Sequence, residues 1–231
     1  MAELLTVSER WRQEHPEAAG AWLEAFVPPG TGRESRLLEF QEATLKEIRA
    51  AHSSRSRGEL RALPVFLAYE RYYKKFRKTY HVFLQFRSLV LEGRPFPRTP
   101  PLVRVMFLSE MRTFLLTAVH DLQQVRGPVI LDSAEGGEEY EALGGGEQRL
   151  KTGDMYMRDS DGIVSSVLSG PDGRTMTTDG TTSALYASYL PQGVGFGEGE
   201  AHLDFLTEAL RAYSDGLEIR SRGIVGGKTE S

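Results

Sequence analysis

Residues 154–189 read DMYMRDSDGIVSSVLSGPDGRTMTTDGTTSALYASY, and this stretch decides the fold. It contains three short runs rich in apolar and β-favouring residues, 154–159, 163–169 and 183–189. Turn-forming residues separate the runs: Asp161-Gly162, Pro171-Asp172-Gly173 and Asp179-Gly180. Such residues reverse the chain, and closely spaced strands pair antiparallel. Two further runs, 129–133 and 140–143, precede the stretch, so we expect a mainly antiparallel second half.

The first half predicts helices, because five of the 24 glycines precede residue 127 and 19 follow from there. Ser8 is expected to cap a helix toward His15, and Ser35 a helix through His52. Further helices are predicted over 17–26, over 67–91 with a break near Thr79-Tyr80, in a short segment after Ser109, and over 202–213, with a strand over 102–108. The pattern predicts one α+β domain over 1–231, with a helical portion 1–92, a β-rich portion 93–220 and a flexible tail 221–231.

Composition limits the possible classes of protein. Forty per cent hydrophobic and 26% charged residues fit a folded globular chain, and zero cysteines exclude disulfides and thiolate sites. No apolar run approaches the ~20 residues of a membrane helix, and no secretory start is recognisable, so we expect a cytoplasmic protein. The net charge is −4, yet residues 55–104 carry twelve Lys plus Arg against three acids, a surplus of +9 that leaves −13 elsewhere.

The cationic surplus peaks between residues 71 and 78. Arg71, Lys74, Lys75, Arg77 and Lys78 alternate with aromatic residues in this stretch. Cations can bind phosphates and aromatic faces can stack on unpaired bases, which would make this an RNA-binding surface. The competing interpretation is an amphipathic helix that buries its aromatics and exposes its charges.

His120-Asp121 is a second candidate site, either a metal pair or a general base held by a carboxylate. Adjacent residues seldom face the same way, and the other histidines show no ligand spacing, so we expect no metal and favour a structural role in which Asp121 caps a turn. The hydroxyl-rich residues 165–183 can orient a water or donate to an oxyanion, but exposed hairpins without such a role contain the same residues. No Gly-x-Ser-x-Gly elbow or phosphate loop is present, and no cofactor is predicted.

Several segments in order resemble a known family. They are residues 93–98 (GRPFPR), 118–122 (AVHDL), 129–134 (VILDSA), 137–140 (GEEY), 153–159 (GDMYMRD) and the Thr181-Thr182 turn. Together they resemble the B3/B4 domain of the phenylalanyl-tRNA synthetase beta chain in a free-standing form, closely over about half of the chain. The resemblance implies an α+β fold in three layers of sheets and helices around a concave site.

The resemblance further implies a domain that receives the charged 3′ end of a tRNA and hydrolyses the wrong aminoacyl ester, a quality-control step of translation. A second pocket of this kind removes errors that a first pocket cannot reject. An activated ester needs chiefly a positioned water and oxyanion donors. The implied site residues are His120, Asp121, Thr181 and Thr182 for catalysis, and Gly170, Arg158 and Arg174 for the pocket. Ala118 stands where the synthetase motif has a histidine.

The sequence therefore predicts a tRNA-binding protein, with hydrolysis of mischarged aminoacyl-tRNA in trans as a further expectation. Arg71, Lys74, Lys75, Arg77 and Lys78 are the predicted phosphate contacts. The alternative is a silent pocket for a free amino acid or similar metabolite, which the −13 remainder favours. Neither interpretation involves a membrane or DNA. The amino acid, the RNA and the oligomeric state stay open.

Overall fold

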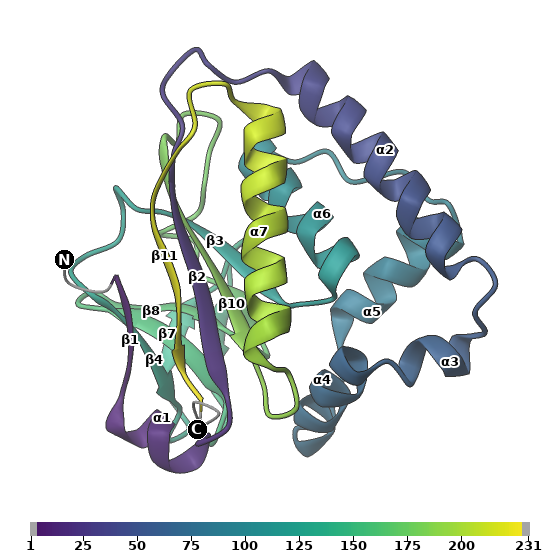
Figure 1. Cartoon of the computed structure of the whole chain (residues 1–231). Coiled ribbons are helices and arrows are strands. Elements are labelled where there is room, and N and C mark those ends of the chain that lie inside the picture. The colour runs from purple at the N-terminus through teal and green to yellow at the C-terminus, as the bar shows by residue number, and fades with distance from the viewer. Residues whose placement is uncertain (1–3, 228–231) are drawn as a thin grey trace.

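The computed structural model describes residues 4–227 and shows an α+β fold (Figure 1). A five-stranded sheet has the order β1 (Leu5–Val7), β4 (Val129–Ser133), β7 (Met155–Asp159), β8 (Gly162–Ser166) and β9 (Gly170–Pro171). A four-stranded sheet has the order β11 (Glu218–Gly226), β2 (Ala19–Phe26), β10 (Ser183–Leu190) and β3 (Thr117–Asp121). A small hairpin joins β5 (Glu139–Glu141) and β6 (Glu147–Arg149). The helical elements are α1 (Glu9–Glu14), α2 (Glu34–His52), α3 (Arg57–Arg61), α4 (Pro64–Lys75), α5 (His81–Phe86), the π-helical turn η1 (Arg87–Leu91), α6 (Pro101–Thr113) and α7 (Phe196–Tyr213).

The strands pair as the turn residues predict. Apart from the parallel pair β1–β4, the strand pairs among residues 4–227 are antiparallel, which confirms the α+β class. The strands expected over 129–133, 154–159, 163–169 and 183–189 are present as β4, β7, β8 and β10. The run 140–143 forms β5 in part, because its strand ends at Glu141.

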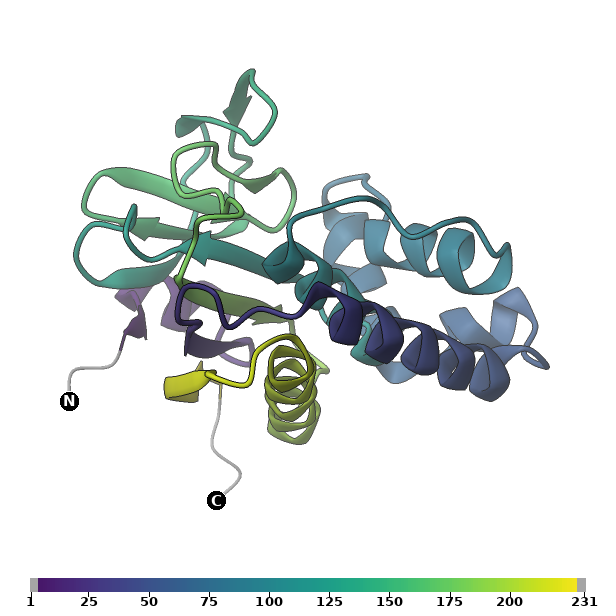
Figure 2. The same ribbon diagram turned by 90° about the horizontal axis from the view of Figure 1, so that it is seen from above.

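The two large sheets pack face to face, and α7 covers the outer face of the four-stranded sheet (Figure 2). Neighbouring residues of β2 show both contacts. A Cβ on Gly20 would lie 2.3 Å from Leu131 Cδ1 in the five-stranded sheet, while Ala21 lies against Gly199 of α7. Because alternate residues of a strand point to opposite faces, β2 is buried on both sides.

Local signals explain the helices that the sequence predicts correctly. Ser8 caps α1 by accepting a hydrogen bond from Trp11 N at 3.0 Å. The helix expected up to His52 is α2, but Ser35 does not cap it, because α2 begins at Glu34 after Arg33 and has no side-chain cap. The long helical run breaks before Tyr80, between α4 and α5, and α7 covers the predicted 202–213. None of the helices within residues 4–227 has the length and apolar character that crossing a bilayer requires.

The helix predicted over 17–26 is wrong, because these residues contain strand β2. The segment AGAWLEAF is rich in alanine, which favours helix, and it lacks the alternation of a half-buried strand. Burial on both faces removes that alternation. The portion 1–92 is consequently not purely helical, since β2 pairs with β10 and β11 inside the four-stranded sheet.

Three other local predictions are wrong. Residues 102–108 lie in α6, where Pro101 occupies the first turn and Leu102, Val105 and Leu108 recur along a buried helix face. No separate short helix follows Ser109, because α6 continues to Thr113 and strand β3 begins at Thr117. The tail expected from residue 221 forms the end of β11 up to Gly226, paired with β2, whereas residues 228–231 lie outside the described part.

Candidate functional site

A cavity of about 420 Å³ lies where α5 and α6 meet strand β3 and the strand ends and loops between β8 and β10. Its size falls in the range of small-molecule sites. Leu143 and Met176 line it and are both exposed, so two loops bring apolar side chains to its edge. Its wall is mostly apolar, and the lining residues are His81, Gln85, Thr99, Pro100, Val103, Met106, Phe107, Glu110, Leu116, Thr117, Ala118, Val119, Leu143, Ser165, Ser166, Val167, Gly170, Pro171, Met176, Thr177 and Tyr189.

Glu110 is the buried acid of this wall. Its side chain projects from α6, is 2% exposed and accepts a hydrogen bond from Thr117 N at 2.9 Å. Burial raises the pKa of Glu110 to about 8, because the charged form loses its hydration. Within residues 4–227 no Lys, Arg or His forms an ion pair with Glu110, although Arg104 and Arg112 on the same helix pair with acids of α2. A carboxyl with this pKa is mostly protonated, and so mostly neutral, at pH 7.

Three further polar atoms in the wall lack hydrogen-bond partners among the described residues. They are Gln85 Oε1, Thr99 Oγ1 and Thr177 Oγ1. Buried polar atoms are normally paired, because an unpaired one loses its interaction with water without compensation. Unpaired atoms at a cavity wall are consequently available to a ligand.

The tyrosines of the cationic stretch are buried and anchor α4 to the sheets. Tyr72 Oη donates to Asp154 Oδ1 at 2.8 Å, and Tyr73 Oη donates to the carbonyl of Val167 at 2.7 Å. Tyr69 donates to the carbonyl of Tyr189. These rings form part of the core and are not free to stack on bases, so the amphipathic interpretation is correct for the aromatics.

The cations of the same stretch stay exposed. Arg71, Lys74, Lys75, Arg77 and Lys78 all reach solvent at the end of α4 and in the turn after it. Together with Lys151 they form what we call the cationic face.

One residue of the cationic face contacts the chain directly beside the cavity wall. Lys78 Nζ donates to the carbonyl of Leu168 at 2.7 Å, and Leu168 follows Val167 of the cavity wall. Lys151 lies far away in the sequence, but its Nζ is 3.3 Å from the carbonyl of Phe76. Sequence reasoning missed Lys151 because the fold alone places it there.

His120, Asp121 and Thr181 hold the loop between β9 and β10. His120 Nδ1 lies 2.7 Å from Thr175 Oγ1, and Thr181 Oγ1 donates to Asp121 Oδ2 at 2.8 Å. Burial lowers the pKa of His120 to about 4, so its ring is neutral. Thr182 accepts from Gln123 Nε2 at 3.4 Å. These four residues lie outside the cavity lining, and the loop that they hold supplies Met176 and Thr177 to it.

The other predicted pocket residues separate into two kinds. Gly170 lines the cavity and accepts a hydrogen bond from Tyr140 Oη at 2.7 Å. Arg158 pairs with Asp132 at 2.9 Å, and Arg174 pairs with Asp159 at 2.9 Å, both outside the lining. Across residues 4–227, no group of three or more His, Asp or Glu side chains is arranged to hold a metal ion.

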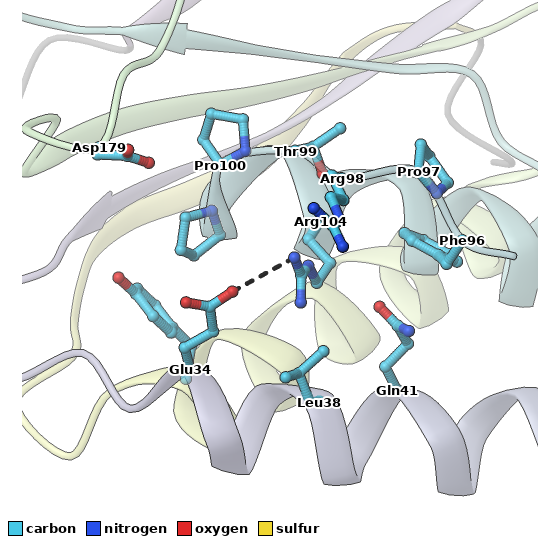
Figure 3. A pocket seen from close by; sticks show the side chains of 12 residues that line it. Glu34, Leu38, Gln41, Phe96, Pro97, Arg98, Thr99, Pro100, Arg104 and Asp179 are labelled. Atoms are coloured by element: carbon cyan, nitrogen blue, oxygen red, sulfur yellow. Dashed lines mark ion pairs between the residues drawn. The ribbon is translucent and has the colours of Figure 1, made fainter.

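A second hollow of about 770 Å³ opens between α2 and residues 96–101 (Figure 3). Arg104, which is 8% exposed, pairs with Glu34 at 3.4 Å inside it. Buried Gln41 Oε1 has no partner among the described residues. Thr99 and Pro100 line this hollow as well as the cavity, so one short segment forms a wall of both.

Comparison with known proteins gives little more. No family model and no curated protein matches the chain. Among solved structures, it is similar to an N-terminal fragment of the phenylalanyl-tRNA synthetase beta-subunit from Pyrococcus horikoshii, with a TM-score of 0.46 and 14% sequence identity. The match covers 96% of this chain and 50% of that one, so this chain spans half the length of its neighbour. A likeness at this level is distant and carries no information about the site.

Proposed function

We propose that this protein binds tRNA through its cationic face and takes the aminoacyl group at the 3′ end into the cavity. The observation that carries the proposal is the contact between Lys78 and the carbonyl of Leu168, the residue that follows Val167 of the cavity wall. A polyanion on this face would bring its end close to an apolar hollow.

The two parts contribute different energies. Exposed cations bind phosphates in a salt-dependent way that is independent of base sequence. The cavity supplies selectivity, because burying an apolar side chain of valine to phenylalanine size contributes about 1.5–3 kcal/mol. Its 420 Å³ accommodates such a group with its ester link.

Hydrolysis of the ester is the finer part of the proposal. Thr177 and Ser166 bring hydroxyls to the wall, and Gly170 brings backbone to it, where a water or an oxyanion can be positioned. In this scheme His120, Asp121 and Thr181 act as positioning residues, since they hold the loop that carries Thr177.

A free amino acid or similar metabolite is the second candidate occupant. The observation that favours a small occupant is that buried Glu110 and the unpaired acceptors of the wall could bind the amine of such a molecule without RNA. The two candidates differ in whether the cationic face contributes to affinity.

The salt dependence of tRNA binding tests the cationic face. Lys74→Ala with Lys75→Ala should flatten the plot of log affinity against log salt by about two, at about one per lost phosphate contact. Lys46→Ala with Arg211→Ala removes two exposed cations of α2 and α7 and serves as the matched control. An unchanged slope in the first variant would contradict the proposed footprint.

A panel of misacylated tRNAs tests the chemistry. Ester loss faster than in buffer indicates a hydrolase, whereas thermal stabilisation by an amino acid without turnover indicates a binder. Ala118→Leu narrows the cavity at a buried lining position and should weaken whichever activity is present. Full activity in that variant would place the site elsewhere.

A further inference from the structure

The polar groups that the cavity wall offers to a ligand include one carboxyl and several hydrogen-bond acceptors. Glu110 is its carboxyl, and Gln85 Oε1, Thr99 Oγ1 and Thr177 Oγ1 are unpaired atoms able to accept hydrogen bonds. The described lining contains no Lys or Arg. A ligand with a cationic donor group matches such a wall, whereas a ligand carboxylate would be left without a counter-charge.

The surroundings of Glu110 supply no competing cation. On α6, Arg104 and Arg112 pair with Glu34 and Glu47 of α2. His202 of α7 approaches from the far side of Thr117, and burial lowers its pKa to about 3, so it is neutral. The other titratable groups that line the cavity are His81 of α5 and Tyr189 of β10, while Tyr69 and Tyr73 of α4 and Tyr80 before α5 lie behind its wall. Burial lowers the pKa of His81 and raises the pKa of these tyrosines, which favours the neutral form of each.

We propose that Glu110 receives the ammonium group of the ligand, so that the cavity selects an aminoacyl ester over both a desamino ester and a free amino acid. An ester keeps the ammonium but has lost the carboxylate that the wall cannot neutralise. The inference rests on the proposed function and names the substrate class of that same cavity.

Binding then moves one proton. At pH 6 the ligand amine is charged and Glu110 carries its proton in the empty cavity, since burial holds its pKa near 8. When the ammonium enters, the carboxyl ionises, its proton leaves to solvent and an ion pair replaces the neutral acid. Affinity therefore rises with pH between 6 and 7 by up to tenfold.

Titration calorimetry on the full chain at pH 6 tests this in two buffers of different ionisation enthalpy. The probes are L-phenylalanine methyl ester, methyl 3-phenylpropanoate, which lacks the amine, and free L-phenylalanine. The first ester should bind about tenfold to a hundredfold more tightly than either of the others, the range expected for a charged hydrogen bond, with close to one proton released. Glu110→Gln should lose the preference for the amine and the proton release, and Glu42→Gln, an exposed acid on α2, should keep both.

The outcomes separate the two proposals. If both esters bind with the same affinity, or if the unaltered protein prefers the amine ester without releasing a proton, the assignment of Glu110 is overturned. The cavity then remains the binding site. If the amine ester is preferred with proton release but tRNA binding ignores the cationic face, Glu110 stands and the tRNA proposal falls. If no ester binds, both are overturned. Proton release is measured on the unaltered protein. The inference can therefore be refuted even if the Glu110→Gln variant does not fold.

Discussion

Replacing Glu110 with glutamine should make the protein more stable at pH 8 than the unaltered chain. Glu110 has a pKa of about 8 in the folded state against 4.5 for an ordinary glutamate. The native state therefore binds more protons than the unfolded state between these values, and the contribution of Glu110 to stability falls as pH rises. At 1.36 kcal/mol per pH unit, and with half of the acid ionised at pH 8, the loss from pH 6.5 to 8 is about 1.6 kcal/mol.

Urea unfolding at pH 6.5, 7, 7.5 and 8 measures this difference. Glutamine keeps the oxygen that accepts from Thr117 N and never ionises, so the variant should match the unaltered protein at pH 6.5 and exceed its free energy of unfolding by about 1.6 kcal/mol at pH 8. Buried histidines such as His120 and His202 titrate alike in both proteins and cancel from the difference. A difference that stays constant over this pH range would refute the account of Glu110 as a buried neutral acid.

Three other substitutions test the packing around the site. Gly20→Ala places a Cβ 2.3 Å from Leu131 Cδ1 between the two sheets and should lower the free energy of unfolding by about 1–3 kcal/mol. Chemical denaturation measures this loss, and the double variant with Leu131→Val should regain part of the lost stability. Tyr72→Phe removes one of the hydrogen-bond donors of Asp154, and burial raises the pKa of this aspartate to about 6. The free energy of unfolding should therefore fall by about 1–3 kcal/mol above pH 6, where Asp154 is charged, and by less below it. A loss that does not depend on pH would contradict this account of the hydrogen bond. His202→Ala removes the ring whose hydrogen bonds to Thr113 and Thr117 connect α6 with β3, and it should lower the melting temperature by several degrees. An unchanged melting curve would show that these hydrogen bonds do not contribute to stability.

The sequence predicts the parts of the fold that local chemistry determines. Gly162 follows Asp161 at the turn between β7 and β8 and has a φ of 135°, a conformation that glycine adopts without strain. Ser8 caps α1 through one hydrogen bond within its own segment. Signals of this kind lie within a few residues of the structure that they determine. They predict most of strands β7, β8 and β10 correctly.

Strand β2 and helix α6 show where local reading fails. Both segments are apolar on several sides, so the spacing of apolar residues does not clearly indicate either a strand or a helix. Contacts with segments distant in the sequence then decide which of the two forms. Glu110 escapes sequence reasoning for the same reason. Between Ser109 and Met111 it resembles an ordinary helical glutamate in the sequence. Its burial and its raised pKa depend on the cavity and on the buried tyrosines of α4, which only the fold brings next to it.

The candidate site was partly predictable. The cationic stretch is visible in composition, and Gly170 does line the cavity. His120 and Asp121 attract attention because their chemistry is familiar, yet strand β3 directs them to neighbours in the loop that follows β9. The roles of these residues in binding and catalysis stay predictions.

The position of β2 has a consequence for biosynthesis. Its hydrogen-bonding neighbours are β10, which begins at Ser183, and β11, which ends at Gly226, so more than 150 residues must leave the ribosome before β2 can pair on either side. Such non-local pairing slows folding, and until then β2 is an apolar segment with open hydrogen-bonding groups on both edges. A nascent chain stalled before residue 183 therefore presents this segment to chaperones or to other copies of itself.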